Sequence, residues 1–566
     1  MTPRRVAFAG IVAAALVMVS APGVFSQGAA FDFVIRNGKI VDGSGNPWFY
    51  GDVAIKDGRI MVIGRVAATT TREIDAKGLV VTPGFIEMHG HSGIPLLVSG
   101  MAESTLRQGI TTVSEGEGDS PAPAIGFARK DLETSLKSYG LALDWATLGE
   151  YFERLQRQGI STNFYSFVSQ GTIRKAVYGV VNRPPSMAEM SEMKALTERA
   201  MNDGAFGLSS SMSHPPGIWA SREEYVELAK IVARYGGIYT RHLEDEGDSL
   251  VDAIKKVIEV SEGAGVPAEI FHLKVAGPRN WGKLAEEAIR VIEDARARGL
   301  EIWADQYPYE RSGWPLANSI PSWAREGGDE EMVKRLNDRA TRRRIRADIE
   351  KGLVNSGIGM TKDGLENIYI STLASAANQK NIGKSVAQIA RERDAEPIET
   401  FFDLLAEENG RVGATYWWMD DGDIQRFMKQ PWVAFGTDGA AIAPTGPLSR
   451  GKPHPRYYGT FPRILGRYVR ELKVITLEDA IRKATSLPAQ RLGIRDRGLL
   501  REGMWADVTI FNPDTVVDRA TYDSPHQFPA GIEYVLVNGV VVIDRGTHTG
   551  LMPGKVLRKS QPLPPN

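Results

Sequence analysis

The sequence predicts an α/β protein, namely a (β/α)8 barrel of the TIM type joined to a small β-sandwich domain built from both chain ends. Two patterns predict it. Eight apolar, strand-like segments in the middle of the chain alternate with helical segments, and hairpin-like segments occur near both termini. With 566 residues, 42% hydrophobic and 24% charged, the chain has the composition of a soluble globular protein with one large domain and additions.

The N-terminus has the pattern of a secretory signal peptide, which we assign to residues 1–26. Two arginines precede an apolar run that ends at Val19, and small residues follow. Cleavage is expected near Ser26, with a site near Ala21 as the alternative. The run is shorter than the roughly 20 residues that span a bilayer. We therefore expect an exported protein, periplasmic or secreted, whose mature chain has no stable membrane insertion.

Segments 27–82 and 491–566 are expected to supply the two parts of the small β domain, with a tail at the C-terminus. The first segment contains alternating stretches broken by Asn-Gly and Asp-Gly, which is the pattern of β-hairpins. In the second segment, "ADVTIFNP" and "IEYVLVNGVVVIDRG" have the same character.

Residues 83–490 are expected to form the barrel. Strands that alternate with helices such as 221–236 and 248–265 imply a parallel sheet, and a closed barrel of eight strands carries its functional residues at their carboxyl ends. The stretch 415–419 could be a further strand, so the count stays open. The strand candidates are 79–89, 109–117, 163–171, 206–214, 237–242, 269–274, 301–309 and 432–439.

The charge balance excludes some classes of partner. A formal net charge of −1 gives no general attraction for nucleic acid or for an anionic membrane, so we expect no nucleic-acid partner. The basic run 339–346 lies in a helical insertion expected at about 315–366; it is interpreted as a solvated helix face, with anion binding as the alternative. The absence of cysteine excludes disulfides, a cysteine nucleophile and thiolate ligands.

Polar residues gather at the predicted carboxyl ends of the strands. In "GFIEMHGHSG", two histidines follow an apolar run and are two residues apart, so on a strand they share a face. Together with later strand ends they form a set of imidazoles and carboxylates that suits a catalytic Zn²⁺ ion. The set comprises His89, His91, Glu117, His242, His272 and Asp438.

The chemistry of this set predicts a hydrolase. Zinc lowers the pKa of bound water towards about 7 and thereby supplies hydroxide at neutral pH. Asp438, in "FGTDGA", is the candidate acid/base that takes the proton of the water and gives it to a leaving amine. A turn aspartate in a Thr-Asp-Gly sequence is the alternative interpretation.

The order of these motifs resembles the amidohydrolase superfamily. "PGFIEMHGH", two later strand-end histidines and a late strand-end aspartate follow its pattern. The finer motifs resemble its N-acyl-D-amino-acid deacylase (D-aminoacylase) family and extend from about residue 32 to about residue 558. They are "QGITTV…SPAP", "GAFGLSSSMSHPPG", "HLEDEG", "FHLKVAG", "ADQYPY", "HPRYYGTFPRILG" and "FPAGIEYVLVNG".

The resemblance implies a role for each matching residue. His89 and His91 match the ligands of the first metal, and His242 and His272 match those of the second. Asp438 matches the acid/base. The residues that match the group holding the α-carboxylate of the substrate are Lys274, Tyr309 and Arg456; a fixed guanidinium and an ammonium are natural carboxylate partners.

This chain departs from the family pattern at three places. Glu117 stands where the family commonly has a cysteine ligand, and because a carboxylate can bridge two metals, two zinc ions are favoured over one. Glu115 and Asp119 lie close enough in sequence to be alternatives for this position. Glu244 replaces an arginine and His214 replaces an aromatic residue, which puts the D-amino-acid preference in question more than the hydrolysis.

The implied function is zinc-dependent hydrolysis of N-acyl amino acids, with the D configuration expected, by attack of metal-bound hydroxide. The substrate is then a small molecule with a carboxylate, and the oligomeric state is left open. The alternative keeps the metal site but acts on small dipeptides, cyclic amides or lactones. A periplasmic binding protein without catalysis ranks last, since no member of the expected site is missing.

Overall fold

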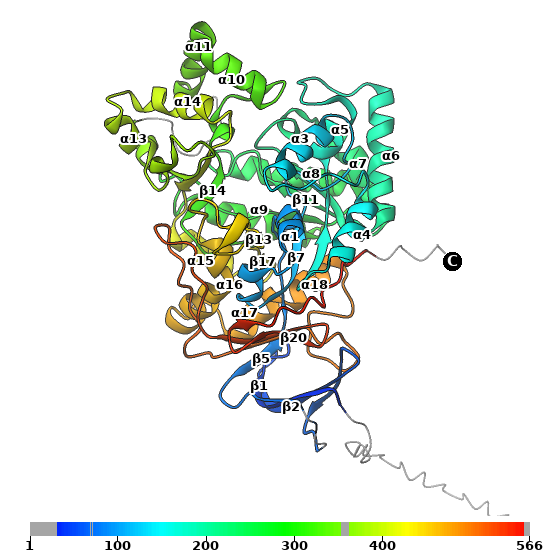
Figure 1. Cartoon of the computed structure of the whole chain (residues 1–566). Coiled ribbons are helices and arrows are strands. Elements are labelled where there is room, and N and C mark those ends of the chain that lie inside the picture. Colours follow the sequence, from blue (N-terminus) through cyan, green and yellow to red (C-terminus); the bar gives the residue numbers. More distant parts are fainter. Residues whose placement is uncertain (1–30, 68–69, 71, 353–361, 560–566) are drawn as a thin grey trace, which may run out of the picture.

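The computed structural model describes residues 31–67, 70, 72–352 and 362–559. The predicted signal peptide, 1–26, lies outside the described residues. Figure 1 shows a central barrel, a small β domain below it and an α/β excursion above it. Within the described residues, no helix is long and apolar enough to cross a membrane.

Eight parallel strands form the barrel, as the sequence predicts. Each pairs with the next in chain order, and the turn after the last strand bridges Gly439 to Gly90 beyond the first. One strand is broken into two pieces, β8 and β9. The strands are β6 (Phe85–Ile86), β7 (Ile110–Glu115), β8 (Asn163–Ser166) with β9 (Val168–Ser169), β10 (Gly207–Ser211), β11 (Ile238–His242), β12 (Ala268–Ile270), β13 (Ile302–Gln306) and β17 (Val433–Phe435).

Amphipathic helices cover the barrel (Figure 1). In α8 (Leu250–Ala264) the buried residues Leu250, Ile254 and Val257 recur at three- and four-residue spacing, so they form one apolar stripe facing the strands. Each such buried side chain contributes about 1.5–3 kcal/mol by leaving water. Other covering helices are α3 (Gly126–Lys137), α4 (Leu148–Gln158), α5 (Gln170–Tyr178), α6 (Met187–Asp203), α7 (Arg222–Arg234) and α9 (Leu284–Ala297).

Both ends of the chain build the small β domain. Its nine strands form one sheet, in which β5 of the N-terminal part pairs antiparallel with β18 of the C-terminal part. Apolar residues of both parts, such as Ile35 and Val508, share one core cluster. The strands are β1 (Phe33–Ile40), β2 (Phe49–Lys56), β3 (Arg59–Gly64), β4 (Glu73–Asp75), β5 (Val80–Pro83), β18 (Val508–Phe511), β19 (Ile532–Val537), β20 (Val540–Asp544) and β21 (Thr547–His548).

A glycine divides what the sequence presents as one strand running from Val80 to Met88. The structure breaks it at Gly84, so that β5 belongs to the small domain and β6 to the barrel. A Cβ at Gly84 would collide with the side chain of Thr111, and the backbone N–H of Gly84 donates to the carbonyl of Asp507 at 2.8 Å. Only glycine therefore fits where the chain passes between the two sheets.

The excursion between β13 and β17 is larger than the predicted helical insertion at 315–366. It begins with β14 (Arg311–Pro315) and ends with β16 (Gly413–Trp417); with β15 (Ile368–Thr372) these form a separate antiparallel sheet. The strand-like stretch 415–419 thus lies outside the barrel. The associated helices are α10 (Asp329–Asn337), α11 (Arg339–Glu350), α12 (Lys362–Glu366), α13 (Val386–Glu392) and α14 (Pro397–Glu407).

The basic run 339–346 lies in α11, where it forms salt bridges within the excursion. Arg342 forms salt bridges to Glu399 at 2.8 Å and to Asp403 at 2.6 Å. Arg342 therefore packs α11 on α14, while Arg339, Arg343 and Arg344 are exposed, as expected for a solvated helix face.

Two C-terminal segments leave the small domain and return to the barrel. Residues 553–556 bridge to Ile160 and Phe164 beside β8. The connection between β18 and β19 brings Asp518 and Tyr522 close to the excursion, where Tyr522 Oη accepts from the backbone N–H of Arg311 at 3.3 Å.

Candidate metal centre

The predicted strand-end residues converge at the carboxyl end of the barrel. His89 and His91 follow β6, Glu117 follows β7, His242 ends β11, His272 lies two residues beyond β12 and Asp438 follows β17. All six approach one another in space although they span most of the chain. The carboxyl end is where parallel barrels carry their active sites.

Glu117 lies between two pairs of histidines. Its Oε2 is 2.8 Å from Nε2 of His89 and 3.1 Å from Nε2 of His91. Its Oε1 is 2.5 Å from Nδ1 of His242 and 3.7 Å from Nε2 of His272. Each carboxylate oxygen therefore belongs to a different group of nitrogen ligands.

The residues next to Glu117 have other partners. The carboxylate of Glu115 accepts from the backbone N–H of Gly93 at 2.5 Å, and Asp119 forms a salt bridge with Lys175 at 2.9 Å. Of the three acidic residues in this loop, Glu117 is the one that faces the histidines.

Asp438 lies beside the first histidine pair, because the last barrel strand, β17, closes the barrel next to β6. Its Oδ1 lies 3.1 Å from Nε2 of His91, and its backbone N–H donates to the carbonyl of His89 at 2.9 Å. Its Oδ2 lies 3.0 Å from Nη1 of Arg456. Asp438 has φ +46°, a conformation that aspartate tolerates better than most residues and that fixes the direction of the side chain.

These residues fit two metal ions that share one bridging carboxylate. The candidate ligand atoms lie within 4.8 Å of one another in each of two groups, and Glu117 belongs to both. Carboxylates lie near the outer nitrogens, as is usual for metal-bound imidazoles: Nδ1 of His272 lies 3.0 Å from Glu246, and Nδ1 of His89 lies 3.6 Å from Asp305, beyond hydrogen-bond distance. The two groups are His89, His91, Glu117 and Asp438, and Glu117, His242 and His272.

The electrostatics keep the carboxylates charged. Burial raises the pKa of Glu117, but His89 and His242 outweigh it and hold that pKa well below its usual range. Burial also raises the pKa of Asp438, but Arg456 and His89 outweigh it and hold that pKa below its usual range. Burial lowers the pKa of His89, yet Glu117 and Asp438 prevail and raise it to about 10. This concentration of negative charge is the environment that a cation requires.

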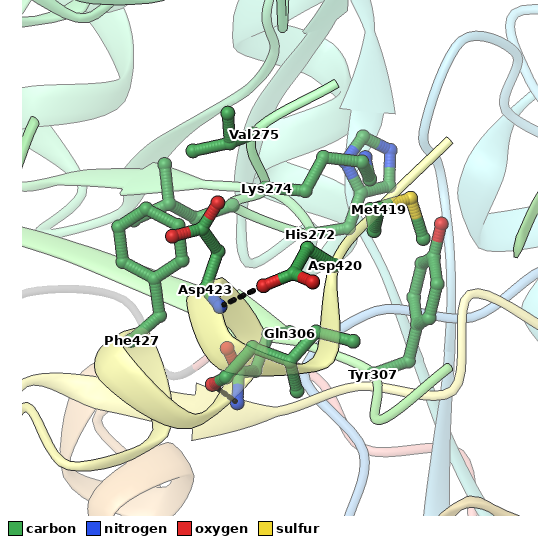
Figure 2. A pocket seen from close by; sticks show the side chains of 11 residues that line it. His272, Lys274, Val275, Gln306, Tyr307, Met419, Asp420, Asp423 and Phe427 are labelled. Atoms are coloured by element: carbon green, nitrogen blue, oxygen red, sulfur yellow. Dashed lines mark hydrogen bonds between the residues drawn. The ribbon is translucent and has the colours of Figure 1, made fainter. Parts of the chain in front are cut away.

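Lys274 and Arg456 lie on one side of the centre with a tyrosine between them. Nζ of Lys274 contacts Glu246 at 2.5 Å and Nδ1 of His272 at 2.6 Å. The guanidinium of Arg456 lies 4.7 Å from the ring centre of Tyr307, and Nζ of Lys274 lies 5.7 Å from it. Figure 2 shows Lys274, His272 and Tyr307 around a small cavity that Met419 also lines.

The structure places Tyr307, rather than the predicted Tyr309, beside these cations. The hydroxyl of Tyr309 donates to Oδ2 of Asp518 at 3.4 Å, and its ring packs on Arg463. The hydroxyl of Tyr307 is buried and has no hydrogen-bond partner among the described residues. Two tyrosines separated by one proline cannot be told apart from the sequence, because the contacts that distinguish them come from Arg456 and Lys274 in other segments.

Three further residues of the site were not identified from the sequence. Glu246, in the motif "HLEDEG", holds both His272 and Lys274. The indole of Trp314, from the excursion, stacks on His242 with 6.0 Å between ring centres and 12° between planes. His454 accepts from the backbone N–H of Arg456 at 3.0 Å. Glu246 and His454 lie in the motifs "HLEDEG" and "HPRYYGTFPRILG", whereas no motif marked Trp314.

The unusual residues near His242 have structural partners. Arg241 and Glu244 form a salt bridge at 2.6 Å, so the arginine that precedes the histidine here pairs with the glutamate that follows it. Nδ1 of His214 lies 3.1 Å from Oγ of Ser211, and its ring lies next to Gly118.

Comparisons with known proteins agree with this geometry. Residues 189–543 match the Amidohydrolase family. The chain is 33% identical over 532 residues to an N-acyl-D-glutamate deacylase of Alcaligenes xylosoxydans xylosoxydans, which covers 93% of this chain and 96% of the relative. It is 32% identical to a D-aminoacylase of the same organism, over 94% of this chain and 99% of the relative.

Solved structures show the same similarity. The N-acyl-D-glutamate deacylase of Bordetella bronchiseptica, complexed with zinc and a phosphonate mimic of the tetrahedral intermediate, superposes with a TM-score of 0.79 at 31% identity, covering 94% of this chain and 100% of that chain. A D-aminoacylase studied for its binuclear metal centre gives a TM-score of 0.77 at 30% identity, covering 93% of this chain and 100% of that chain.

Proposed function

The chain belongs to the amidohydrolase family, and from this membership and its metal centre we propose that it hydrolyses the amide bond of N-acyl-D-amino acids to a carboxylate and a free amino acid. The observation that carries the proposal is the position of Glu117, whose two oxygens face two histidine pairs. Three relatives at 31–33% identity span nearly the whole chain: an N-acyl-D-glutamate deacylase, a D-aminoacylase and an N-acyl-D-aspartate deacylase.

We assign two zinc ions to the centre. His89, His91 and Asp438 would hold the first, His242 and His272 the second, and Glu117 would bridge them. Imidazole and carboxylate ligands without thiolates suit zinc. When bound, zinc polarises the acyl carbonyl and lowers the pKa of a water molecule.

The protein residues then move one proton and orient the substrate. Asp438, held ionised by Arg456, accepts the proton of the attacking water at Oδ1 or Oδ2 and returns it to the leaving amine nitrogen. Glu246 orients the imidazole of His272, and the Asp305 carboxylate lies near that of His89. The indole of Trp314 lies parallel to the imidazole of His242.

The α-carboxylate of the substrate would bind on the side of the centre that carries Lys274, Tyr307 and Arg456. Both cations are buried, 6% and 3% exposed, which strengthens their attraction for an anion. Arg456 is already fixed by its hydrogen bond to the carbonyl of Gly313 at 3.2 Å, so little entropy is lost when it binds.

The small-molecule substrate is the expected partner, and we propose export as the location because of the pattern in residues 1–26. Fractionation of the native cell tests this: the mature chain should be found outside the cytoplasm with an N-terminus near residue 27, and a full-length cytoplasmic chain would contradict it.

A paired hydrolysis assay tests the proposed function. The zinc-loaded protein is incubated with N-acetyl-D- and N-acetyl-L-amino acids that carry acidic, apolar and polar side chains, and the free amino acid is measured. Release from the D enantiomers alone supports the proposal. Turnover of dipeptides, cyclic amides or lactones without turnover of any N-acetyl amino acid would replace it with the alternative substrate class.

A further inference from the structure

We propose that a second cavity of this protein, separate from the metal centre, binds a small oxyanion. The cavity has a volume of about 190 Å³. Cavities of about 150 Å³ accept a molecule as large as benzene, so this one is large enough for phosphate or for a small carboxylate with its hydration waters. It lies between the excursion sheet, the segment that precedes α16 (Arg456–Arg463) and the connection between β18 and β19.

Two cations and one carboxylate line the cavity, so its charge is positive. The cations are Arg311 and Lys452, and the carboxylate is Asp523, which is exposed at the rim. The hydroxyl-bearing side chains of the lining come from three different segments. They are Tyr369, Ser371, Thr415, Thr521 and Tyr522.

Arg311 is fixed in place without a carboxylate partner. Its guanidinium lies 4.1 Å from the ring centre of Tyr369 and 4.2 Å from that of Tyr522, between the two phenols. Among the residues that the structure describes, it forms no salt bridge. Stacking of this kind holds the guanidinium plane while its N–H donors stay available for an anion.

Lys452 is accommodated by a glycine. A Cβ at Gly383 would lie 2.8 Å from Nζ of Lys452, so the absence of a side chain at Gly383 makes room for the ammonium group. In the described part of the chain, this ammonium group has no acidic partner within salt-bridge distance. An oxyanion between the planar donors of Arg311 and the point charge of Lys452 would satisfy both.

Tyr522 and His454 lie between this cavity and Arg456 at the metal centre, and contacts through them connect the two. The rings of Tyr522 and His454 meet edge to face with 5.1 Å between their centres. Nε2–H of His454 donates to the carbonyl of Arg311 at 2.9 Å, and Nδ1 accepts from the backbone N–H of Arg456. An anion bound to Arg311 would therefore contact β14, the strand whose Gly313 carbonyl accepts a hydrogen bond from Arg456. Arg456 in turn forms a salt bridge with Asp438.

The oxyanion has two chemical sources, and both are probes in the test. Inorganic phosphate represents a free anion, and acetate represents the carboxylate that the proposed reaction releases from N-acetyl substrates. Binding of each to the zinc-free full chain is measured by isothermal titration calorimetry, because the zinc-free protein cannot bind the probe through metal. The measurement is made on the wild type, Arg311→Met, Lys452→Met and the matched control Arg344→Met, whose guanidinium lies over Trp323 outside the cavity.

We expect at least one probe to bind to the wild type. Each cavity variant, Arg311→Met and Lys452→Met, should raise the Kd of that probe by about tenfold or more, while Arg344→Met leaves the Kd unchanged. The probe that binds identifies the source. Binding of neither probe by the wild type, or equal Kd values in all four proteins, would overturn the proposal. Circular dichroism of each variant confirms the fold, and Lys452→Met supplies an independent answer if Arg311→Met does not fold. The outcome is independent of the proposed hydrolysis, because no turnover is measured.

Discussion

Glu117 Oε1 lies 2.5 Å from Nδ1 of His242, a residue 125 positions later in the chain. The other oxygen of the same carboxylate, Oε2, lies 2.8 Å from Nε2 of His89. One side chain therefore joins candidate ligands from the first and the fifth strand of the barrel. A carboxylate in this position carries charge as well as bridging geometry, because it balances part of the positive charge that two divalent ions bring. The centre therefore depends on Glu117 more than on any single histidine.

Replacement Glu117→Gln tests this dependence. The amide keeps the size of the side chain but loses the negative charge, so we expect one of two zinc ions to be lost and kcat to fall about 100-fold or more. Zinc content is measured by plasma emission spectrometry after dialysis. In the matched control Asp119→Asn, on the same loop but paired with Lys175, zinc content should stay at the wild-type value. A full complement of two ions in Glu117→Gln would contradict the bridge.

Zinc affinity should rise with pH. The pKa of His89 in the metal-free protein is raised from 6.5 to about 10 by Glu117 and Asp438, which outweigh burial. Between these two values His89 carries a proton that a free imidazole would have lost, and zinc must displace that proton. Affinity should therefore increase up to about tenfold per pH unit for each proton released. Competition with a chelator at several pH values measures the slope, and a flat profile would contradict the assignment.

Tyr307→Phe and Tyr309→Phe form a matched pair that tests which tyrosine faces the substrate. Loss of the Tyr307 hydroxyl should raise KM for an N-acetyl-D-amino acid about tenfold, since a hydrogen bond to a charged group is lost. Tyr309→Phe removes a contact with Asp518 and should leave KM close to the wild-type value. The reverse order of KM values would return the role to Tyr309.

A buried ion pair of the small domain contacts the barrel through Asn163 on β8. Arg497 and Asp507 are 3% and 4% exposed, and Asp507 also accepts from Nδ2 of Asn163 on β8 at 3.0 Å. Arg497→Met would leave Asp507 charged and without its buried partner, so it should lower the free energy of unfolding by about 3–5 kcal/mol. Urea denaturation measures this free energy of unfolding. Removal of the exposed pair Arg129–Glu133 should cost about 0–1 kcal/mol, and an equal loss in both variants would refute the distinction.

The parts of the site that could be predicted are those fixed by strand periodicity. His89 and His91 follow one strand on one face, and His242 and His272 occupy the ends of two others, so their convergence follows from barrel geometry. The barrel itself was predictable because strand-like segments alternate with amphipathic helices along the chain.

The features of the fold and the site that could not be predicted depend on contacts between segments far apart in the sequence. The break at Gly84 is set by Thr111 and by the carbonyl of Asp507, neither of which a local pattern reveals. The orientation of Tyr307 depends on Arg456, which lies in another segment. The excursion exceeds the predicted 315–366 because its strands β14 and β16 pair across about 100 residues of sequence.

We infer that Asp438 carries the proton in hydrolysis of an N-acyl-D-amino acid at this metal centre. The most direct test compares zinc content and turnover of N-acetyl-D- and N-acetyl-L-amino acid pairs in the wild type and in Asp438→Asn. We expect the wild type to release the D amino acid. We expect the variant to retain bound zinc while its kcat falls by about 100-fold or more, the low end of what a proton-transfer group contributes. Undiminished turnover by a zinc-loaded Asp438→Asn, or turnover of the L enantiomer alone by the wild type, would contradict it.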